Sequence, residues 1–259
     1  MPEAMNGGVA IHYEVEGDGE GPPIVLHTGA AGDLEMWRQA GYVEGLSGMR
    51  VVLMDHRGHG RSGRPTDLAE HRIDRYAADV LAVADAAGLA RFAFLGYADG
   101  TAVGWALAAR DPDRVDAVIG LGSAGDPDKW AEERRWLAGA CRAGGMGRLL
   151  EGLRSMGDEL PEWYEQQMLG TDPEMMALEL EGWADWDGGW SELGKIQARS
   201  LIVVGELEEG TEGQAAAHAK EAAAWMPNGR VEVLPGLGHV AVFTRSELVL
   251  PLIPGFLKE

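Results

Sequence analysis

Short apolar runs alternate with segments of helical spacing along most of the chain. Residues 8–16 alternate apolar and polar positions, as in a half-exposed edge strand. Six further runs are expected to be strands of a parallel sheet, at 24–27, 50–55, 91–95, 115–121, 200–205 and 231–234. Those at 24–27, 50–55 and 115–121 are expected to be buried on both faces. Helical segments are expected at 33–46, 71–87, 101–110 and 213–226, with one more after His239. This rhythm predicts an α/β fold with a doubly wound, mostly parallel sheet.

Between residues 125 and 193 the rhythm stops, and only helix-like segments punctuated by glycine and proline remain. The stretch holds six of the nine tryptophans, and we expect it to form a helical cap inserted into a core of residues 1–124 and 194–259. Large apolar side chains there either build the cap's own small core or line a pocket beneath it. The candidates for substrate contact are Trp130, Trp136, Trp163, Trp183, Trp186 and Met146, with Tyr97 from the core.

Composition and charge narrow the function classes. With 259 residues, 46% of them hydrophobic and 25% charged, the chain resembles ordinary globular proteins. Its formal charge of −20 argues against nucleic acid or an anionic membrane as a partner. We expect neither a signal peptide nor a membrane span, and the single cysteine, Cys141, excludes an internal disulfide and a thiolate metal cluster. The expectation is a cytoplasmic monomer or homodimer that uses no metal and no cofactor.

The stretch from Arg91 to Ala102 carries the strongest chemical signal. It reads as an apolar strand, a turn between Gly96 and Gly100, and a helix rich in small residues. This is the pattern of a nucleophile elbow, in which Gly-x-nucleophile-x-Gly raises one side chain above the end of a parallel sheet. The glycines are required because the strand and helix backbones pass too closely for a Cβ. At the centre of the pattern stands Ala98, which has no nucleophilic atom.

Acyl transfer on such a scaffold also needs a base and an acid that orients it. Both should follow strands of the sheet, in the chain order nucleophile, acid, histidine. His239 comes after the last predicted strand and a Gly-x-Gly turn, and it is the predicted base. Glu208, three residues past Gly205, is the predicted acid, with Glu206 and Glu209 as alternatives.

The developing oxyanion of acyl transfer needs two N–H donors. The backbone N–H of Asp99, directly after the apex, is the first expected donor. The second is expected from Gly29 or Ala30, in the small-residue loop after the strand at 24–27. The side chain of Asp99 is not expected to be a nucleophile, because one position past the apex it should point away.

The chain resembles the α/β-hydrolase fold superfamily, in particular its small cap-bearing esterases and lactonases, over essentially its whole length. The motifs that carry the resemblance are His-Thr-Gly at 27–29, Asp-His-Arg-Gly-His-Gly-Arg-Ser at 55–62, Gly-Tyr-Ala-Asp-Gly at 96–100, Gly-Glu-Leu-Glu at 205–208 and Gly-His at 238–239. Each motif is weak alone, but five in the correct order are strong. The resemblance implies cofactor-free hydrolysis of a small, largely apolar ester or lactone. The family normally has serine at the position of Ala98 and more often aspartate at that of Glu208, where glutamate also serves.

Ala98 leaves three interpretations open. In the first, alanine stands in place of serine by deliberate substitution, and the chain is a catalytically impaired variant of an esterase or lactonase. In the second, the chain is a natural pseudoenzyme that binds a small apolar ligand. In the third, His239 is the base of a lyase or another cofactor-free enzyme that needs no serine. The first is preferred, because an elbow apex is strained by on the order of 1–3 kcal/mol and a non-catalytic chain has little reason to keep it.

Overall fold

The computed structural model describes residues 2–122, 127–208 and 213–258. Within these residues an eight-stranded sheet has the order β1-β2-β4-β3-β5-β6-β7-β8. The strands are β1 (Glu3–Asn6), β2 (Val9–Glu16), β3 (Ile24–His27), β4 (Val51–Met54), β5 (Phe92–Tyr97), β6 (Val115–Leu121), β7 (Arg199–Gly205) and β8 (Gly229–Leu234). Strand β2 is antiparallel to both neighbours, β1 and β4, and every pair from β4 to β8 is parallel. The predicted doubly wound, mostly parallel sheet is confirmed.

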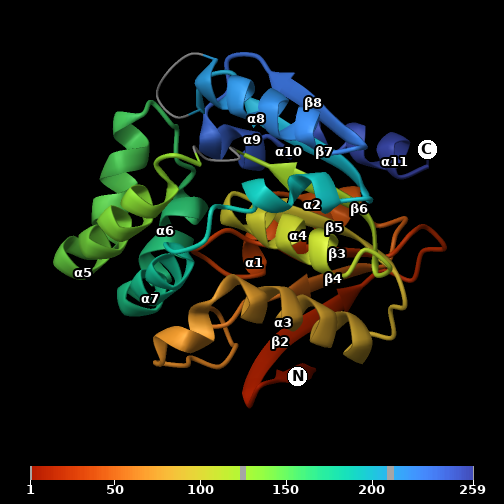
Figure 1. The fold of residues 1–259 in the computed structure, drawn as a ribbon, viewed down its shortest axis with the longest axis horizontal. Helices are drawn as coiled ribbons and strands as arrows, with labels where there is room; N and C mark the ends of the chain where they lie inside the picture. The colour runs from red at the N-terminus through yellow and green to blue at the C-terminus, as the bar shows by residue number, and fades with distance from the viewer. Residues whose placement is uncertain (1, 123–126, 209–212, 259) are drawn as a thin grey trace.

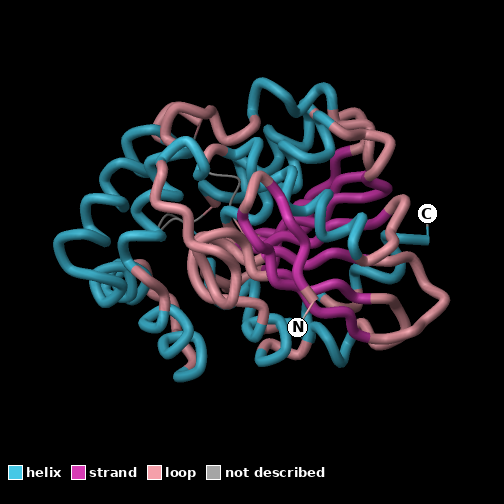
Figure 2. The backbone as a smooth tube through the Cα atoms, turned by 90° about the horizontal axis from the view of Figure 1, so that it is seen from below, coloured by secondary structure: helices cyan, strands magenta, loops and turns pink. Residues whose placement is uncertain are grey.

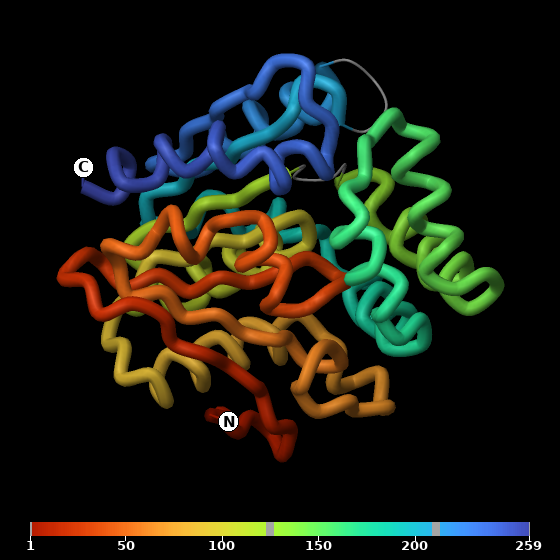
Figure 3. The backbone as a smooth tube through the Cα atoms, turned by 180° about the vertical axis from the view of Figure 1, so that it is seen from behind, coloured from red at the N-terminus to blue at the C-terminus, as the bar shows by residue number. Residues whose placement is uncertain are grey.

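Helices cover both faces of the sheet, which explains why its central strands are apolar on both sides (Figure 1). One face carries α3 (Ile73–Ala86), α4 (Asp99–Arg110) and α8 (Gln214–Trp225). The other carries α1 (Glu35–Gln39), α2 (Tyr42–Gly45), α9 (His239–Thr244), α10 (Ser246–Val249) and α11 (Leu252–Lys258). Seen from behind, the C-terminal helices lie beside α1 and α2 (Figure 3), where the rings of Trp37 and Tyr42 each pack against Phe243.

The segment between β6 and β7 (residues 130–195), named the cap segment after the expectation that it forms a cap, consists of helices and short connecting loops. It comprises α5 (Trp130–Ser155), α6 (Glu162–Gly170), α7 (Pro173–Trp183) and the 3₁₀ helix η2 (Trp190–Lys195); a second 3₁₀ helix, η1 (Leu68–His71), precedes α3. Helices α5, α6 and α7 gather at one end of the molecule, and the C-terminus lies at the other (Figures 1 and 2). Within the described residues, no helix combines the length and the apolar character that crossing a bilayer demands.

Two local features differ from the sequence-based expectations. The sequence pattern predicts no strand before residue 8, yet β1 pairs with β2 and takes the sheet edge, so that β2 lies one strand inside. The helix expected over 33–46 is split into α1 and α2, because Gly41 adopts a left-handed φ of 83°. The N-cap position of α1 is Leu34, but Oδ1 of Asp33, one residue earlier, does accept the N–H of Glu35 at 2.9 Å.

Candidate active site

Ala98 forms the turn between β5 and α4, and its backbone takes φ 50° and ψ −121°. Among the described residues it is the one non-glycine residue with positive φ. Such a conformation costs a residue with a Cβ on the order of 1–3 kcal/mol. Two hydrogen bonds hold the turn: Ala98 N–H donates to the carbonyl of Leu121 at 2.7 Å, and the carbonyl of Ala98 accepts from Thr101 N–H at 2.9 Å. The surrounding structure therefore maintains a strained apex.

The glycines on either side of Ala98 are required by close backbone passage. A Cβ at Gly96 would lie 2.4 Å from the carbonyl oxygen of Gly100. A Cβ at Gly100 would lie 2.6 Å from the carbonyl oxygens of both His27 and Thr28. Neither contact is possible without a shift of the backbone. The structure thus contains the steric constraint that the Gly-x-x-x-Gly pattern indicates.

His239 and Glu208 meet although 31 positions separate them. His239 begins α9 after β8, and its Nδ1 lies in hydrogen-bonding contact with Oε2 of Glu208 at 3.0 Å. The other carboxylate oxygen of Glu208, Oε1, accepts the N–H of Gly205 at 2.7 Å. Glu208 is buried, whereas the side chain of His239 is 23% exposed. Of the two alternative acids, Glu206 accepts the N–H of Gly236 instead, and Glu209 lies outside the described residues.

The imidazole of His239 lies beside the elbow. Its ring stacks on that of Tyr97 with centroids 5.3 Å apart and planes at 25°. A Cβ at Gly122 would lie 2.9 Å from Cε1 of His239 and 3.6 Å from the backbone nitrogen of Ala98, so both groups border this glycine. Strands β5, β6, β7 and β8 are parallel neighbours. Their carboxyl ends therefore bring Ala98 after β5, Gly122 after β6, and His239 after β8 to the same edge of the sheet.

The surroundings of His239 favour its protonated form. Burial alone would lower the pKa of this imidazole, because it penalises the charged ring. The hydrogen bond and the charge of Glu208, assisted by the carboxylates of Asp158 and Asp99, outweigh burial and raise the pKa of His239 above its ordinary value. An imidazole held by a carboxylate in this way is suited to accept a proton from a neighbouring hydroxyl group.

The loop after β3 lies against the apex. A Cβ at Gly29 would come within 3.0 Å of the methyl carbon of Ala98 and within 3.7 Å of the backbone nitrogen of Asp99. Ala30 follows and is buried. The two chain regions expected to supply oxyanion donors are therefore adjacent in space.

The side chain of Asp99 engages the cap segment. It forms an ion pair with Arg134 of α5, whose guanidinium carbon lies 3.8 Å from the centre of the Trp130 ring. Burial raises the pKa of Asp99, and the charge of Arg134 opposes that rise. Asp99 thus links the first turn of α4 to the cap segment through a partly buried ion pair. A cation–π contact with Trp130 supports this link.

Tyr97 and Trp163 lie near the elbow. The Tyr97 ring stacks on Phe243 as well as on His239, and its hydroxyl lies 3.2 Å from that of Tyr164 in α6. Trp163 packs against Tyr164 and Phe243. Aromatic rings from the core and the cap therefore border the same region.

The remaining candidates for substrate contact lie elsewhere in the cap segment. Trp136 is 62% exposed on α5, so its ring faces solvent. Trp183 is fully buried and packs edge-on against Tyr76, at 4.9 Å between centroids, within the core cluster beside α3. Trp186 packs edge-on against Trp130 at 5.9 Å. Met146 is buried in the other core cluster, the one that also contains Tyr97. The sequence alone does not separate these packing roles from contact with a ligand.

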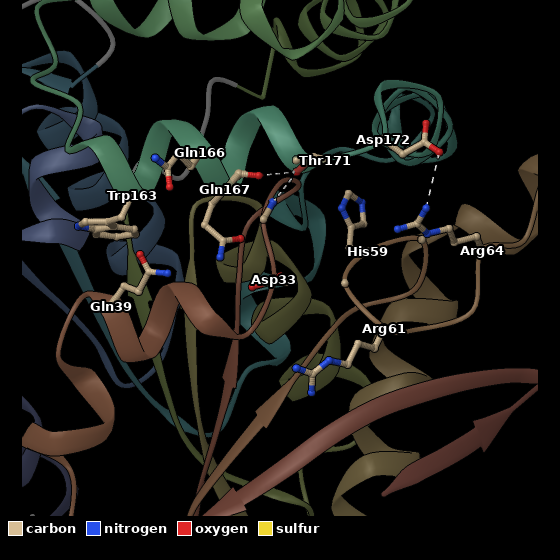
Figure 4. A pocket seen from close by; sticks show the side chains of 14 residues that line it. Asp33, Gln39, His59, Arg61, Arg64, Trp163, Gln166, Gln167, Thr171 and Asp172 are labelled. Atoms are coloured by element: carbon tan, nitrogen blue, oxygen red, sulfur yellow. Dashed lines mark hydrogen bonds and ion pairs between the residues drawn. The ribbon is translucent and has the colours of Figure 1, made fainter. Parts of the chain in front are cut away.

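Two of the cavities that the described residues form lie between the core and the cap segment. The first, of about 370 Å³, is bordered by α6 and by the loops after β3 and β4; Figure 4 shows Trp163, Gln166 and Gln167 of α6 on one side and His59 from the core on another. The second, of about 580 Å³, lies between residues 156–161 of the cap segment and residues 236–245. Gly238, which directly precedes His239, borders the second cavity.

Sequence reasoning did not identify Arg134 or Asp158. Asp158, in the loop between α5 and α6, accepts the N–H of Val240 on its Oδ1 at 3.0 Å and so holds the first turn of α9. Both residues belong to the stretch without a regular pattern, where one charged side chain among many gives no signal. Only the packing of the cap segment on the core brings them to the elbow.

The chain matches known proteins in sequence and in structure. The family model described as "alpha/beta hydrolase fold" matches residues 22–138. The putative carbamate hydrolase RutD of Azorhizobium caulinodans is 39% identical over 119 residues, which are 46% of this chain and 43% of that protein. The 3-oxoadipate enol-lactonase 2 of Acinetobacter baylyi is 31% identical over 51% of this chain and 47% of that protein. The chain therefore spans about half or less of the length of these curated relatives.

Similarity in structure extends over the full length. The crystal structure of the enol-lactonase from Burkholderia xenovorans LB400 superimposes with a TM-score of 0.83 and 28% sequence identity, and the superposition covers 100% of both chains. Together with the sheet topology, this similarity shows that the chain has the α/β-hydrolase fold.

Proposed function

We propose that this chain carries the active site of a hydrolase for a small, largely apolar carboxylic ester or lactone, with alanine in place of the nucleophilic serine. The observation that carries the proposal is the His239–Glu208 pair beside the strained apex at Ala98. Glu208 engages Nδ1 of the imidazole, which leaves Nε2 for the proton of a hydroxyl group at position 98. With a methyl group there, the chain binds substrate and turns it over poorly or not at all.

With serine at position 98, the steps follow from the geometry. The hydroxyl oxygen attacks the acyl carbon and passes its proton to His239, and the oxyanion accepts hydrogen bonds from Asp99 N–H and from Gly29 or Ala30 N–H. Collapse of the intermediate expels an alkoxide, which takes the proton from His239. Water, deprotonated by the same imidazole, then releases the acid and restores the hydroxyl group. In a lactone the alkoxide stays attached to the acyl chain, and the product is a hydroxy acid.

The similar proteins support this substrate class. Two of them are named as enol-lactonases and one as a putative carbamate hydrolase, and each name denotes hydrolysis at a carbonyl carbon bonded to a heteroatom. The rings of Tyr97, Trp163 and Tyr164 beside the elbow favour an apolar substrate. We propose that residues 125–193 act as the cap that encloses it.

Restoring the nucleophile tests the proposal. We expect Ala98→Ser to hydrolyse p-nitrophenyl acetate, p-nitrophenyl butyrate or simple lactones, because the base and the acid are already placed. Loss of a triad serine costs up to about 10⁶-fold in kcat, so the gain should amount to several powers of ten. Ester hydrolysis is measured by the release of p-nitrophenol. Lactone opening is measured by the amount of acid that it produces.

The matched control is the double variant Ala98→Ser with His239→Ala, which should return to the level of the parent chain. A folded Ala98→Ser protein that fails on every acyl substrate would contradict the proposal. The same holds if the double variant keeps the gain, since His239 would then not be the base.

A second candidate function is favoured by Ala98 itself, which offers no nucleophile beside an intact base. In this case His239 removes a proton from carbon in a lyase or another cofactor-free reaction. The parent chain would then exchange a substrate proton for deuterium in D₂O, which NMR measures, and His239→Ala would abolish the exchange. Tight ligand binding without exchange, unaffected by Ala98→Ser, would indicate a non-catalytic binding protein instead.

A further inference from the structure

A cluster of histidines with one carboxylate lies between the core and the cap segment. His56 and His59 stand in the loop after β4, and Glu179 is on α7. Among the described residues these three side chains bring one ligand atom each within 4.8 Å of one another. All three are buried, with exposures of 0%, 3% and 1%. The mechanism proposed for His239 does not use them.

The distances in this cluster suit a metal ion. Nε2 of His56 lies 3.2 Å from Oε2 of Glu179, and Nε2 of His59 lies 3.0 Å from the same oxygen. Zn²⁺ binds imidazole nitrogen and carboxylate oxygen at about 2.0–2.2 Å, so two ligands on a tetrahedral ion lie about 3.4 Å apart. The two imidazoles lie side by side with centroids 4.0 Å apart. Both nitrogen–oxygen distances are within a few tenths of an ångström of that separation, and the two rings must spread apart for both nitrogens to bind one ion.

His56 supplies a second, independent observation. Its Nε2 is buried and forms no hydrogen bond, although it faces the carboxylate of Glu179. Its other ring nitrogen, Nδ1, lies 3.3 Å from the hydroxyl oxygen of Thr28. When Nδ1–H donates to that hydroxyl, the lone pair of Nε2 faces a carboxylate oxygen, and a proton or a metal cation must lie between the two acceptors. A hydrogen bond from the far nitrogen is also what holds metal-binding histidines in place.

The cluster is accessible. His59 and its neighbours Gly58 and Gly60 border the cavity of about 370 Å³, and Figure 4 shows the His59 ring near Thr171 at the junction of α6 and α7. An ion can therefore enter from the side of His59. Three protein ligands leave a coordination position for water, as in other sites with two histidines and one glutamate.

We propose that His56, His59 and Glu179 form a binding site for a divalent transition-metal ion, Zn²⁺ above all, which ties cap helix α7 to the core. Two imidazoles and one carboxylate favour Zn²⁺, Co²⁺ or Ni²⁺ over Mg²⁺ and Ca²⁺, which prefer oxygen ligands. Two ligands come from the loop after β4 and one from the cap segment, so the bound ion fixes the position of α7. The site does not depend on the function proposed for His239.

Direct metal binding tests the proposal on the full chain. After treatment with a chelator and removal of the chelator, Co²⁺ should give the strong visible absorption of four-coordinate cobalt, and Zn²⁺ should displace it one for one. Zn²⁺ should also raise the thermal midpoint in a concentration-dependent manner, because it binds the folded state. The proposal is overturned if the Co²⁺ spectrum stays that of the hydrated ion and Zn²⁺ shows no saturable binding below about 1 mM. The three side chains would then share protons rather than a metal ion.

Variants locate the ion. His59→Gln and Glu179→Gln keep side-chain size and should each weaken Zn²⁺ binding by about 100-fold, since even an outer-shell partner typically contributes 10–100-fold. His218→Gln on α8 removes a histidine outside the cluster and should leave the affinity unchanged. Circular dichroism of the metal-free variants establishes that they are folded. Binding that survives both substitutions would place the ion elsewhere and refute the proposal.

Discussion

Ala98 has the backbone conformation expected of a nucleophile at an elbow, but its side chain is an unreactive methyl group. Its φ of 50° is stabilised by the hydrogen bonds to Leu121 and Thr101, not by its own methyl group. The sequence predicted this turn because both flanking glycines are required within five positions. It predicted Glu208 as the acid but kept Glu206 and Glu209 as alternatives, since neighbouring carboxylates on one loop have the same local pattern. The geometry favours Glu208, which contacts both Gly205 and His239.

The strain at position 98 can be measured. Ala98→Gly should stabilise the fold by about 1 kcal/mol, because glycine adopts positive φ at little cost and this gain exceeds its larger entropy loss on folding. Urea unfolding gives the free-energy difference. As a control, Ala102→Gly in the regular part of α4 should destabilise by about 1 kcal/mol or more. Equal losses in both variants would show that the apex stores no strain.

At the scale of elements, the short helix α9 determines where His239 stands, and the cap segment helps to hold it. Asp158 accepts the N–H of Val240 in the first turn of α9, and its charge also raises the pKa of His239. The regular helices and strands were predictable because their apolar period is local. The break between α1 and α2 was not, since the pattern over 33–46 continues across Gly41. The strand β1 has only four residues and no clear alternation.

The charge of Asp158 should be visible in a pH profile of the Ala98→Ser protein. His239 must be neutral to accept a proton, so kcat/KM should rise with pH through the pKa of His239, which lies above its ordinary value. Asp158→Asn removes a charge that favours the imidazolium but keeps an acceptor for Val240, and it should move this rise to lower pH.

Glu159, the exposed residue next to Asp158, offers the control. Glu159→Gln removes a charge at the surface and should leave the pH profile unchanged. Asp158→Ala should in addition cost about 1 kcal/mol of stability, because the N–H of Val240 loses its acceptor. If Asp158→Asn does not shift the pH profile, the carboxylate only accepts the N–H of Val240 and its charge does not affect His239.

At the scale of the whole molecule, the chain has 42 acidic and 22 basic residues, which gives a formal net charge of −20. Ion pairs such as those of Arg142 with Glu174 and Glu181 are exposed and contribute little. The excess negative charge repels itself in the compact state more than in the unfolded chain.

Salt should therefore stabilise this protein near neutral pH. Raising NaCl from about 0.01 M to 0.15 M shortens the Debye length from about 30 Å to about 8 Å, and the thermal midpoint at pH 7 should rise by a few degrees. Close to the isoelectric point of about 4.7 the net charge vanishes, and the same salt should have little effect. A midpoint that falls with salt at pH 7 would mean that attractive ion pairs outweigh the repulsion.

The amino-acid sequence by itself determined the alternation of strands and helices, the elbow at Ala98 and the order of acid and histidine. Each of these depends on residues that are close along the chain or on parallel strands that end at one edge of a sheet. Only the tertiary structure decided that Arg134, Asp158 and Glu179 of the cap segment reach the core. Contacts of this kind depend on how an irregular helical segment packs on distant loops, and no periodic pattern records that packing.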